Sequence, residues 1–186
     1  MKIYLIAVLA VIAVACGYRT IAAKTTMQLC NHPYALCTSA TCLPQPDGKA
    51  VCFCDVIEEG PSMATMPCNK LKPTWDDSGT RVLYSTFSLN QFQQGKLGMK
   101  CPSGTPWTWC LNKRCLADPT NPKAALCICD LMQTGEWMTL GGDCDTSTCQ
   151  TGYWSGASMG DFNDGNVFMS HSLGLPDSQV NWCPTE

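Results

Sequence analysis

Two short segments of the chain alternate apolar or small residues with cysteine at every second position. They span residues 49–56 (KAVCFCDV) and 123–131 (KAALCICDL). Successive side chains of an extended strand point to opposite faces, so the two cysteines of each segment share one face and Phe53 or Ile128 points to the other. The pattern therefore predicts two β-strands that each carry a pair of cysteines on one face.

Each of these strands follows a turn and an earlier short strand, which is typical of a β-hairpin. Residues 44–48 (PQPDG) combine proline, which presets φ, with an Asp-Gly pair that tolerates positive φ. Residues 118–122 (DPTNP) hold turn-forming residues at the corresponding place before the second strand. We expect hairpins at 41–55 and 114–130.

Helical signals are weak, because no stretch of the chain sustains an apolar period of 3.6 residues. Ser88 and Gln91 could form a capping box for one helical turn that ends at Gly95. The similar segment 158–162 has a glycine in its interior, so we expect at most a short turn there. The predicted fold class is all-β, small and disulfide-rich.

The cysteines fall into two sets with nearly the same spacing. The numbers of intervening residues are 6, 4, 9, 1 and 13 in the first set and 8, 4, 11, 1 and 14 in the second. The match extends further, since 84–88 (YSTFS) and 154–158 (WSGAS) follow the two sets at similar distances. The first set is Cys30, Cys37, Cys42, Cys52, Cys54 and Cys68, and the second is Cys101, Cys110, Cys115, Cys127, Cys129 and Cys144.

This duplication predicts two tandem repeats of about 70 residues that each contain one β-hairpin. We place cysteine-rich repeat 1 at 24–100 and cysteine-rich repeat 2 at 101–186, with residues 95–100 as a short connector. Units of this size rarely bury enough apolar surface to be stable alone. Disulfides that contribute about 2–4 kcal/mol each would supply the difference.

The start of the chain has the features of a secretory signal peptide over residues 1–23. Lys2 precedes an apolar run at 3–14 that is too short to span a bilayer, and small residues at the end of the segment suit a signal peptidase. Alternatively, residues 13–17 (AVACG) resemble a bacterial lipobox, which would make Cys16 a lipid anchor. Either interpretation places the chain outside the cytoplasm, secreted or in the periplasm or cell envelope. No second apolar run follows, so we expect no transmembrane segment.

The cysteine content favours a disulfide framework over reactive thiols or a metal centre. Of 15 cysteines, Cys16 belongs to the signal segment, which leaves an even number in an exported chain. No Cys-x-x-Cys occurs and the chain has only 2 histidines, so we expect no zinc and no cofactor. Residues 161–166 (DFNDGN) resemble a calcium loop, but Gly165 stands where a ligand is needed, so we predict a plain turn. The predicted disulfide cysteines are the two sets of six together with Cys149 and Cys183.

The charge of the chain disfavours nucleic acid as a partner. The sequence holds 12 basic and 15 acidic residues for a net charge of −3, and the basic residues are scattered. Two of the basic residues lie in the signal segment, so the exported chain is more negative still. The expected partner is an unidentified protein or glycan.

Four serines recur in the two repeats, but their surroundings do not predict an enzyme. A Ser-His-Asp hydrolase needs a Gly-x-Ser-x-Gly elbow or a similar activating context, which none of the four has, and His171 lies near only one pair. We interpret the hydroxyls as bonded to backbone at a repeated turn. The serines are Ser85, Ser88, Ser155 and Ser158.

Tryptophan is concentrated in the second repeat, where it has two interpretations. Trp107, Trp109 and Trp154 could form a ligand platform that stacks on sugar rings, or they could be large core residues of a small domain. Exposure separates the two interpretations, because a platform requires a coplanar row of exposed rings.

The cysteine order with its Cys-x-Cys doublet resembles that of epidermal-growth-factor-like modules. This resemblance implies that the first cysteine pairs with the third, the second with the fourth and the fifth with the sixth. The Cys-Pro, Trp-Cys-Leu and Cys-x-Cys elements also resemble those of uncharacterised cysteine-rich tandem-repeat proteins that bacteria secrete, a likeness that implies no particular activity. The bonds implied by the growth-factor-like order are Cys30–Cys42, Cys37–Cys52, Cys54–Cys68, Cys101–Cys115, Cys110–Cys127, Cys129–Cys144 and Cys149–Cys183.

These observations favour a non-catalytic secreted or cell-envelope protein that serves as a disulfide-stabilised binding or structural module. The repeated residues are cysteines, turn glycines and small hydroxyls, which are the residues of a scaffold. A carbohydrate-binding module is the first alternative and rests on the tryptophans of the second repeat. A protease inhibitor that displays a stapled loop such as 44–48 is the second alternative.

Overall fold

The computed structural model describes residues 26–140, 149 and 153–183. The predicted signal peptide, the predicted lipid anchor at Cys16 and the predicted disulfide cysteine Cys144 lie outside the described residues. Within the described residues, no helix has the length and apolar character needed to cross a membrane.

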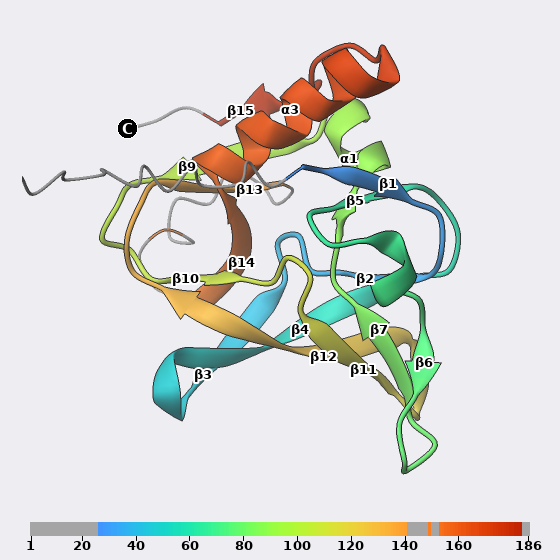
Figure 1. The fold of residues 1–186 in the computed structure, drawn as a ribbon. Helices are drawn as coiled ribbons and strands as arrows, with labels where there is room; N and C mark the ends of the chain where they lie inside the picture. Colours follow the sequence, from blue (N-terminus) through green and yellow to red (C-terminus); the bar gives the residue numbers. More distant parts are fainter. Residues whose placement is uncertain (1–25, 141–148, 150–152, 184–186) are drawn as a thin grey trace, which may run out of the picture.

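Two β-hairpins lie side by side in the centre of one sheet (Figure 1). Both occur where the sequence predicts them. The turn of the first hairpin also has the predicted geometry, because Asp47 and Gly48 adopt φ values of 66° and 68°. The first hairpin consists of β3 (Thr41–Gln45) and β4 (Lys49–Ile57), and the second of β11 (Arg114–Asp118) and β12 (Asn121–Met132).

Among the described residues the other strands are short, and two α-helices accompany them, together with the short 3-10 helices η1 (Pro46–Gly48) and η2 (Cys68–Lys70). The predicted small, all-β, disulfide-rich fold is confirmed. The α-helices are α1 (Leu89–Gln93) and α3 (Met159–Leu173). The strands are β1 (Gln28–Cys30), β2 (Tyr34–Leu36), β5 (Ser62–Ala64), β6 (Thr74–Trp75), β7 (Arg81–Tyr84), β8 (Phe87–Ser88), β9 (Leu97–Cys101), β10 (Trp107–Trp109), β13 (Trp137–Leu140), β14 (Tyr153–Ser158) and β15 (Asn181–Trp182).

The two halves of the chain share this central sheet. β4 pairs with β12, so the four central strands follow the order β3-β4-β12-β11. Each hairpin is then extended by a strand from the other half. β7 pairs with β11, which places Leu83 opposite Cys115, and β14 pairs with β3, which places Tyr153 opposite Cys42. The halves are therefore interlocked through backbone hydrogen bonds.

The strand pairings of the first half recur in the second. β5 pairs with β1 and β8 in the first half, as β13 pairs with β9 and β14 in the second. Likewise, β2 pairs with β4 as β10 pairs with β12. Across β4 and β12, Ala50 lies opposite Cys129 and Cys54 lies opposite Ala125. An approximate two-fold axis normal to the central sheet therefore relates the two halves.

The expectation of at most a short turn at 158–162 is wrong, because α3 is 15 residues long. Two glycines weaken its helix propensity, but its first turn is capped, since Ser158 Oγ accepts a hydrogen bond from Asp161 N at 3.0 Å. Gly165 is a packing residue: a Cβ there would lie 3.2 Å from the ring of Phe92. The predicted turn at 161–166 is consequently part of a helix.

The first half has a much shorter helix at the corresponding place. α1 ends near Gly95, whose φ is 62°, as predicted. Ser88 is its N-cap residue but makes no capping hydrogen bond through its side chain, so the predicted capping box is wrong. The predicted connector at 95–100 is largely strand β9, which pairs with β13.

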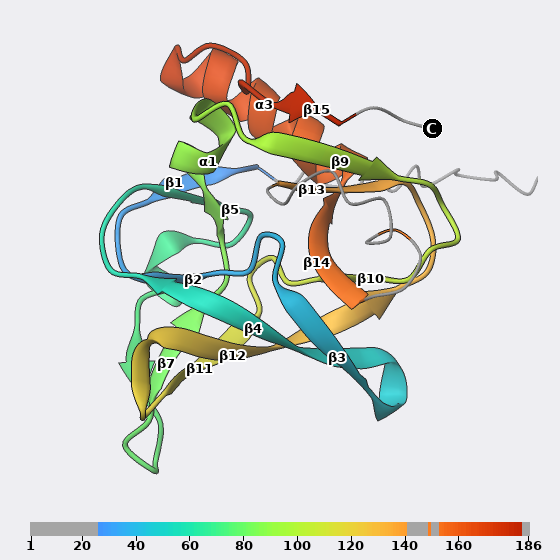
Figure 2. The same cartoon turned by 180° about the vertical axis from the view of Figure 1, so that it is seen from behind.

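The molecule has two layers (Figures 1 and 2). The hairpins form one side, and α1, α3, β1, β9 and β13 form the other. A cysteine-rich cluster lies against the hairpins, and a second cluster of methionine, phenylalanine and aliphatic side chains packs beneath α3. The buried members of this second cluster are Met27, Met63, Leu89, Phe92, Met138, Leu140, Ala157, Phe162 and Met169.

Candidate binding surface on the central sheet

Six disulfides join described cysteines, and they are nested in both halves. In the first half the first cysteine pairs with the sixth, the second with the fifth and the third with the fourth. The two inner bonds recur in the second half, where the outer bond ends at Cys149. Cys183 is also disulfide-bonded. The six bonds are Cys30–Cys68, Cys37–Cys54, Cys42–Cys52, Cys101–Cys149, Cys110–Cys129 and Cys115–Cys127.

The pairing implied by the epidermal-growth-factor-like resemblance is wrong for this chain. The register of the hairpin decides the matter, because Cys42 lies opposite Cys52 with the two Cα atoms 4.0 Å apart. The equivalent cysteines of the second hairpin are 4.1 Å apart. Side chains at opposed positions on one face of a hairpin are direct neighbours, so the third cysteine bonds the fourth. The implied Cys149–Cys183 bond is also wrong, because Cys149 is bonded to Cys101.

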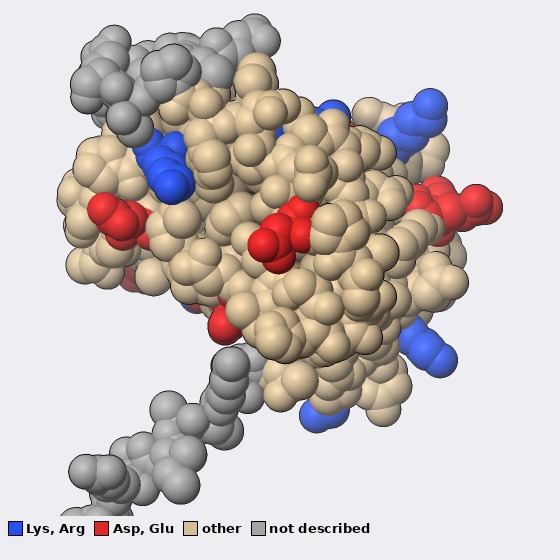
Figure 3. Space-filling view, turned by 90° about the horizontal axis from the view of Figure 1, so that it is seen from above, with Lys and Arg blue, Asp and Glu red and all other residues tan. Residues whose placement is uncertain are grey.

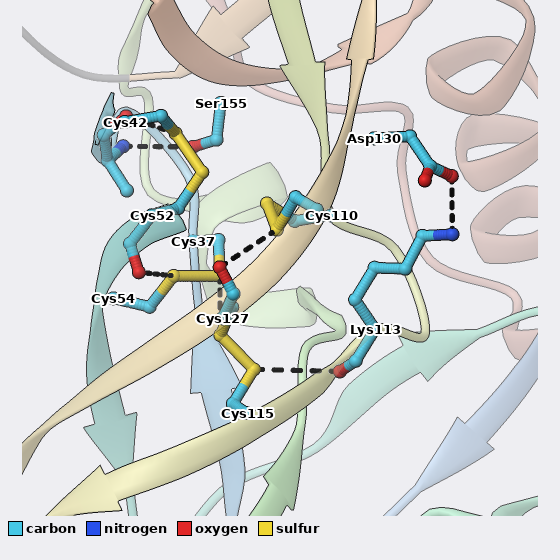
Figure 4. The surroundings of a disulfide bond; sticks show 12 residues. Cys37, Cys42, Cys52, Cys54, Cys110, Lys113, Cys115, Cys127, Asp130 and Ser155 are labelled. Atoms are coloured by element: carbon cyan, nitrogen blue, oxygen red, sulfur yellow. Dashed lines mark hydrogen bonds and ion pairs between the residues drawn. A yellow bond between two sulfur atoms is a disulfide. The ribbon is translucent and has the colours of Figure 1, made fainter. Parts of the chain in front are cut away.

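Four disulfides meet on the inner face of the central sheet, where β4 lies against β12 (Figure 4). The Sγ atoms of Cys37 and Cys127, from different halves, are 3.4 Å apart. The sulfurs of Cys37, Cys115 and Cys127 lie within 4.8 Å of one another, a spacing that would suit a metal ion if they were thiolates. Every cysteine in the described part of the chain is disulfide-bonded, so these sulfurs cross-link the strands.

The opposite face of the same four strands is apolar and exposed to solvent. Four of its side chains are between 43% and 61% exposed, and the other two are partly exposed. Single exposed apolar residues are ordinary, but six on four adjacent strands form a continuous patch. We call this patch the outer sheet face: it consists of Leu43 on β3, Val51 and Phe53 on β4, Leu126 and Ile128 on β12, and Leu116 on β11.

The residues of the outer sheet face form two rows across the strands. Because the strands alternate, these positions point away from the cysteines on either side of them. The approximate two-fold axis exchanges the two rows. Leu43 then corresponds to Leu116, Val51 to Leu126 and Ile128 to Phe53, so every position of the patch is apolar in both rows. One row is Leu43, Val51 and Ile128, and the other is Leu116, Leu126 and Phe53.

The local sequence pattern predicts only part of this surface. Alternation places Phe53 and Ile128 on the face opposite the cysteines, but the residues around them were not predicted. The signal was present, because Leu43 and Leu116 each follow a cysteine directly and so alternate with it in the same way. The pairing of β4 with β12, which brings the rows together, has no local signal in the sequence.

A charged cluster borders the outer sheet face. The Asp130 carboxylate accepts hydrogen bonds from Lys49 Nζ on β4 and from Lys113 Nζ, each at 2.5 Å. Partial burial opposes the charged form of Asp130, but the hydrogen bonds and charges of the two lysines together outweigh burial and lower its pKa. The charge of Lys49 is thus compensated across the junction between the hairpins.

The predicted tryptophan platform lies mainly in a core. Trp107 is 1% exposed and stacks on Trp137, with ring centroids 5.8 Å apart. Trp109 and Trp154 are half-buried against the same cluster, which includes both cysteines of the outer disulfide of the second half. Trp109 Nε1 donates a hydrogen bond to Asp161 at 3.1 Å. A buried indole offers no face to a sugar ring, so the three residues do not form a coplanar exposed row.

Two of the repeated serines, Ser155 and Ser158, bond to backbone, Ser88 bonds the side chain of Tyr34, and the set lies apart from His171. Three of the four are buried. Ser155 Oγ accepts a hydrogen bond from Ala40 N at 3.0 Å, and Ser158 caps α3. His171 is exposed on α3 and lines a groove of about 200 Å³ to which none of the four serines contributes. The described residues therefore bring no serine of this set together with His171.

The fold and its covalent bonds define a small all-β protein stabilised by disulfides, the class that forms in oxidising, extracytoplasmic compartments. Comparison of the chain with protein-family models, with curated proteins and with solved structures gave no match.

Proposed function

We propose that the chain is a non-catalytic secreted or cell-envelope protein that binds a protein partner through the outer sheet face. The observation that carries this proposal is the exposure of four large apolar side chains on adjacent strands: Leu43 at 51%, Phe53 at 52%, Leu126 at 43% and Ile128 at 61%. At about 200 Å² for a fully exposed large side chain, these four present about 400 Å² of apolar surface, a patch size that often marks an interaction site.

The rigidity of the sheet supports the proposal. The strands that carry the patch are cross-linked on their inner face by Cys42–Cys52 and Cys115–Cys127. A surface that is held in one conformation before binding loses less conformational entropy when the partner arrives. Disulfides directly behind the patch therefore lower the entropic cost of binding.

The chemistry of the patch favours a protein partner over a sugar. Carbohydrate sites combine aromatic rings with hydrogen-bonding groups, whereas the outer sheet face has Phe53 as its single aromatic residue and no polar side chain among its six members. Exposed aliphatic and aromatic side chains on adjacent strands match the apolar core of a protein interface. The inhibitor alternative has less support, because the exposed loop at 46–48 is a tight hairpin turn with positive φ at Asp47 and Gly48.

The side of the molecule that carries α3 shows no dense patch of one charge in its described part (Figure 3). On the side that carries α3, basic and acidic side chains are scattered singly among uncharged ones (Figure 3). The side of the molecule formed by the hairpins lies opposite α3 and holds the outer sheet face (Figures 1 and 2).

Photo-crosslinking from a single position tests the proposal. A photoreactive phenylalanine analogue replaces Phe53, and the chain is irradiated where it is naturally exported. We expect a covalent adduct with protein from position 53. The matched control carries the analogue at Val167, which is 45% exposed on α3, and should give none. The absence of any protein adduct from position 53, or equal adducts from both positions, would contradict the proposal.

A further inference from the structure

We infer that the partner of the outer sheet face is a second copy of this chain, and that two copies stack their central sheets face to face. The inference rests on the proposed function, because it uses the same surface. Two β-sheets commonly pack this way at a separation of about 10 Å with apolar side chains between them. In this fold the inner face of the sheet is covered by the rest of the molecule, and the outer face lacks such a cover among the described residues.

The internal symmetry of the patch suits a homodimer. A dimer with two-fold symmetry uses the same patch on both subunits, so the patch has to be complementary to itself. The two rows of the outer sheet face are exchanged by the approximate two-fold axis, and both are entirely apolar. Either row of one copy can therefore pack against either row of the second copy with only apolar side chains in contact.

The area of the patch matches a modest dimer. Four side chains contribute about 400 Å², and the partly exposed Val51 and Leu116 raise the apolar area to about 500 Å² per copy. Two copies would then remove about 1,000 Å² from water, which lies at the lower limit of specific interfaces. Interfaces at this lower limit are typical of weak, reversible complexes, so we expect a dimer that dissociates at concentrations on the order of micromolar.

The charges around the patch do not oppose self-association. None of the six residues is charged, so stacking leaves no charge buried in the centre. On the border, Lys49 is paired with Asp130. Arg114, which precedes Cys115 on β11, lies 3.8 Å from Asp76, and the exposed Asp55 on β4 adds a negative charge two residues after Phe53. Like charges in excess would repel two identical surfaces, and this border carries both signs.

Sedimentation velocity over a concentration series tests the inference on the secreted, oxidised chain. From about 1 to 200 μM, the wild-type chain should shift from the monomer mass to twice that mass. Ile128→Lys places a charge in the centre of the patch on both copies and should weaken dimerisation at least tenfold. Val167→Lys makes the same kind of change at an exposed site on α3 and should dimerise like the wild type.

A second substitution keeps the test decisive if the Ile128→Lys variant does not fold. Leu43→Lys changes a 51% exposed residue at the edge of the hairpin, where it should leave the fold intact and still weaken the dimer. Circular dichroism and the number of titratable thiols identify the variants that are folded. A wild-type chain that stays monomeric throughout the series, or a folded Leu43→Lys variant that dimerises normally, overturns the inference.

The crosslinking experiment separates this inference from the proposed function. An adduct from position 53 with twice the mass of the chain supports the second copy. An adduct with a different protein, and none at twice the chain mass, overturns the inference and leaves the proposed function standing. No protein adduct at all overturns both.

Discussion

Cys127 and Ile128 are neighbours on β12 and lie in opposite environments. Cys127 is fully buried among four disulfides, whereas Ile128 is 61% exposed. The same contrast separates Cys52 from Phe53 on β4. One side of the central sheet is therefore closed by covalent bonds and close packing, and the other is left apolar and open. The contrast indicates that the inner face supplies stability and the outer face is available for binding.

The removal of an inner disulfide should have the largest effect on stability. Cys115–Cys127 closes a sequence separation of 12, so the double variant Cys115→Ala/Cys127→Ala should lower the free energy of unfolding by about 3 kcal/mol, chiefly because the unfolded chain gains freedom. Denaturant titration followed by tryptophan fluorescence measures the loss. The equivalent variant Cys42→Ala/Cys52→Ala releases a separation of 10 and should lose nearly as much. Losses below about 1 kcal/mol in both variants would show that the inner face is not the main source of stability.

Adjacent substitutions on β12 compare the two faces directly. Ala125 is 1% exposed and lies opposite Cys54, so Ala125→Leu overfills the inner face and should cost about 1–3 kcal/mol. Leu126→Ala, at the next position, shortens a side chain that is 43% exposed and should cost less than about 1 kcal/mol. The same denaturant titration measures both variants. Equal costs at the two positions would contradict the contrast between the faces.

The charged border of the outer sheet face should have the smallest effect, and it should depend on pH. Asp130 has a lowered pKa in the folded chain, so its contribution is present above the pKa of the unfolded chain and is lost as the pH falls through the folded value. At neutral pH, Asp130→Asn should lower the free energy of unfolding by less than about 1 kcal/mol, because the ion pairs are partly exposed. The difference from the wild type should shrink below about pH 4. A difference that stays constant down to pH 2 would contradict the role assigned to the lysines.

The parts of the fold that depend on local sequence could be predicted. Both hairpins were predicted, because alternation and turn residues act over a few positions, and Asp47-Gly48 adopts the expected positive φ. α3 was missed because glycine propensity argued against it. The helix is stabilised by the cap at Ser158 and by the packing of Gly165 against Phe92. The local sequence pattern does not show that Phe92 lies next to Gly165.

The disulfide pairing and the candidate site depended on information that the sequence pattern does not contain. The order of the cysteines resembles that of epidermal-growth-factor-like modules. In each hairpin, however, the strand register places the third cysteine directly opposite the fourth, so these two are bonded. The pairing of β4 with β12 joins residues about 75 positions apart and creates the outer sheet face. Alternation showed that Phe53 points away from the cysteines, but could not show that its side of the sheet is exposed.

The nesting of the disulfides also bears on how the chain becomes oxidised. The innermost bonds close separations of 10 and 12, the next close 17 and 19, and the outermost close 38 and 48. The entropic cost of bringing two cysteines together grows with the length of chain between them, so the hairpin bonds have the easiest encounter. Each bond then shortens the effective loop for the next bond outward. The six bonds between described cysteines can therefore form from the two turns outward without the exchange of any bond that has already formed.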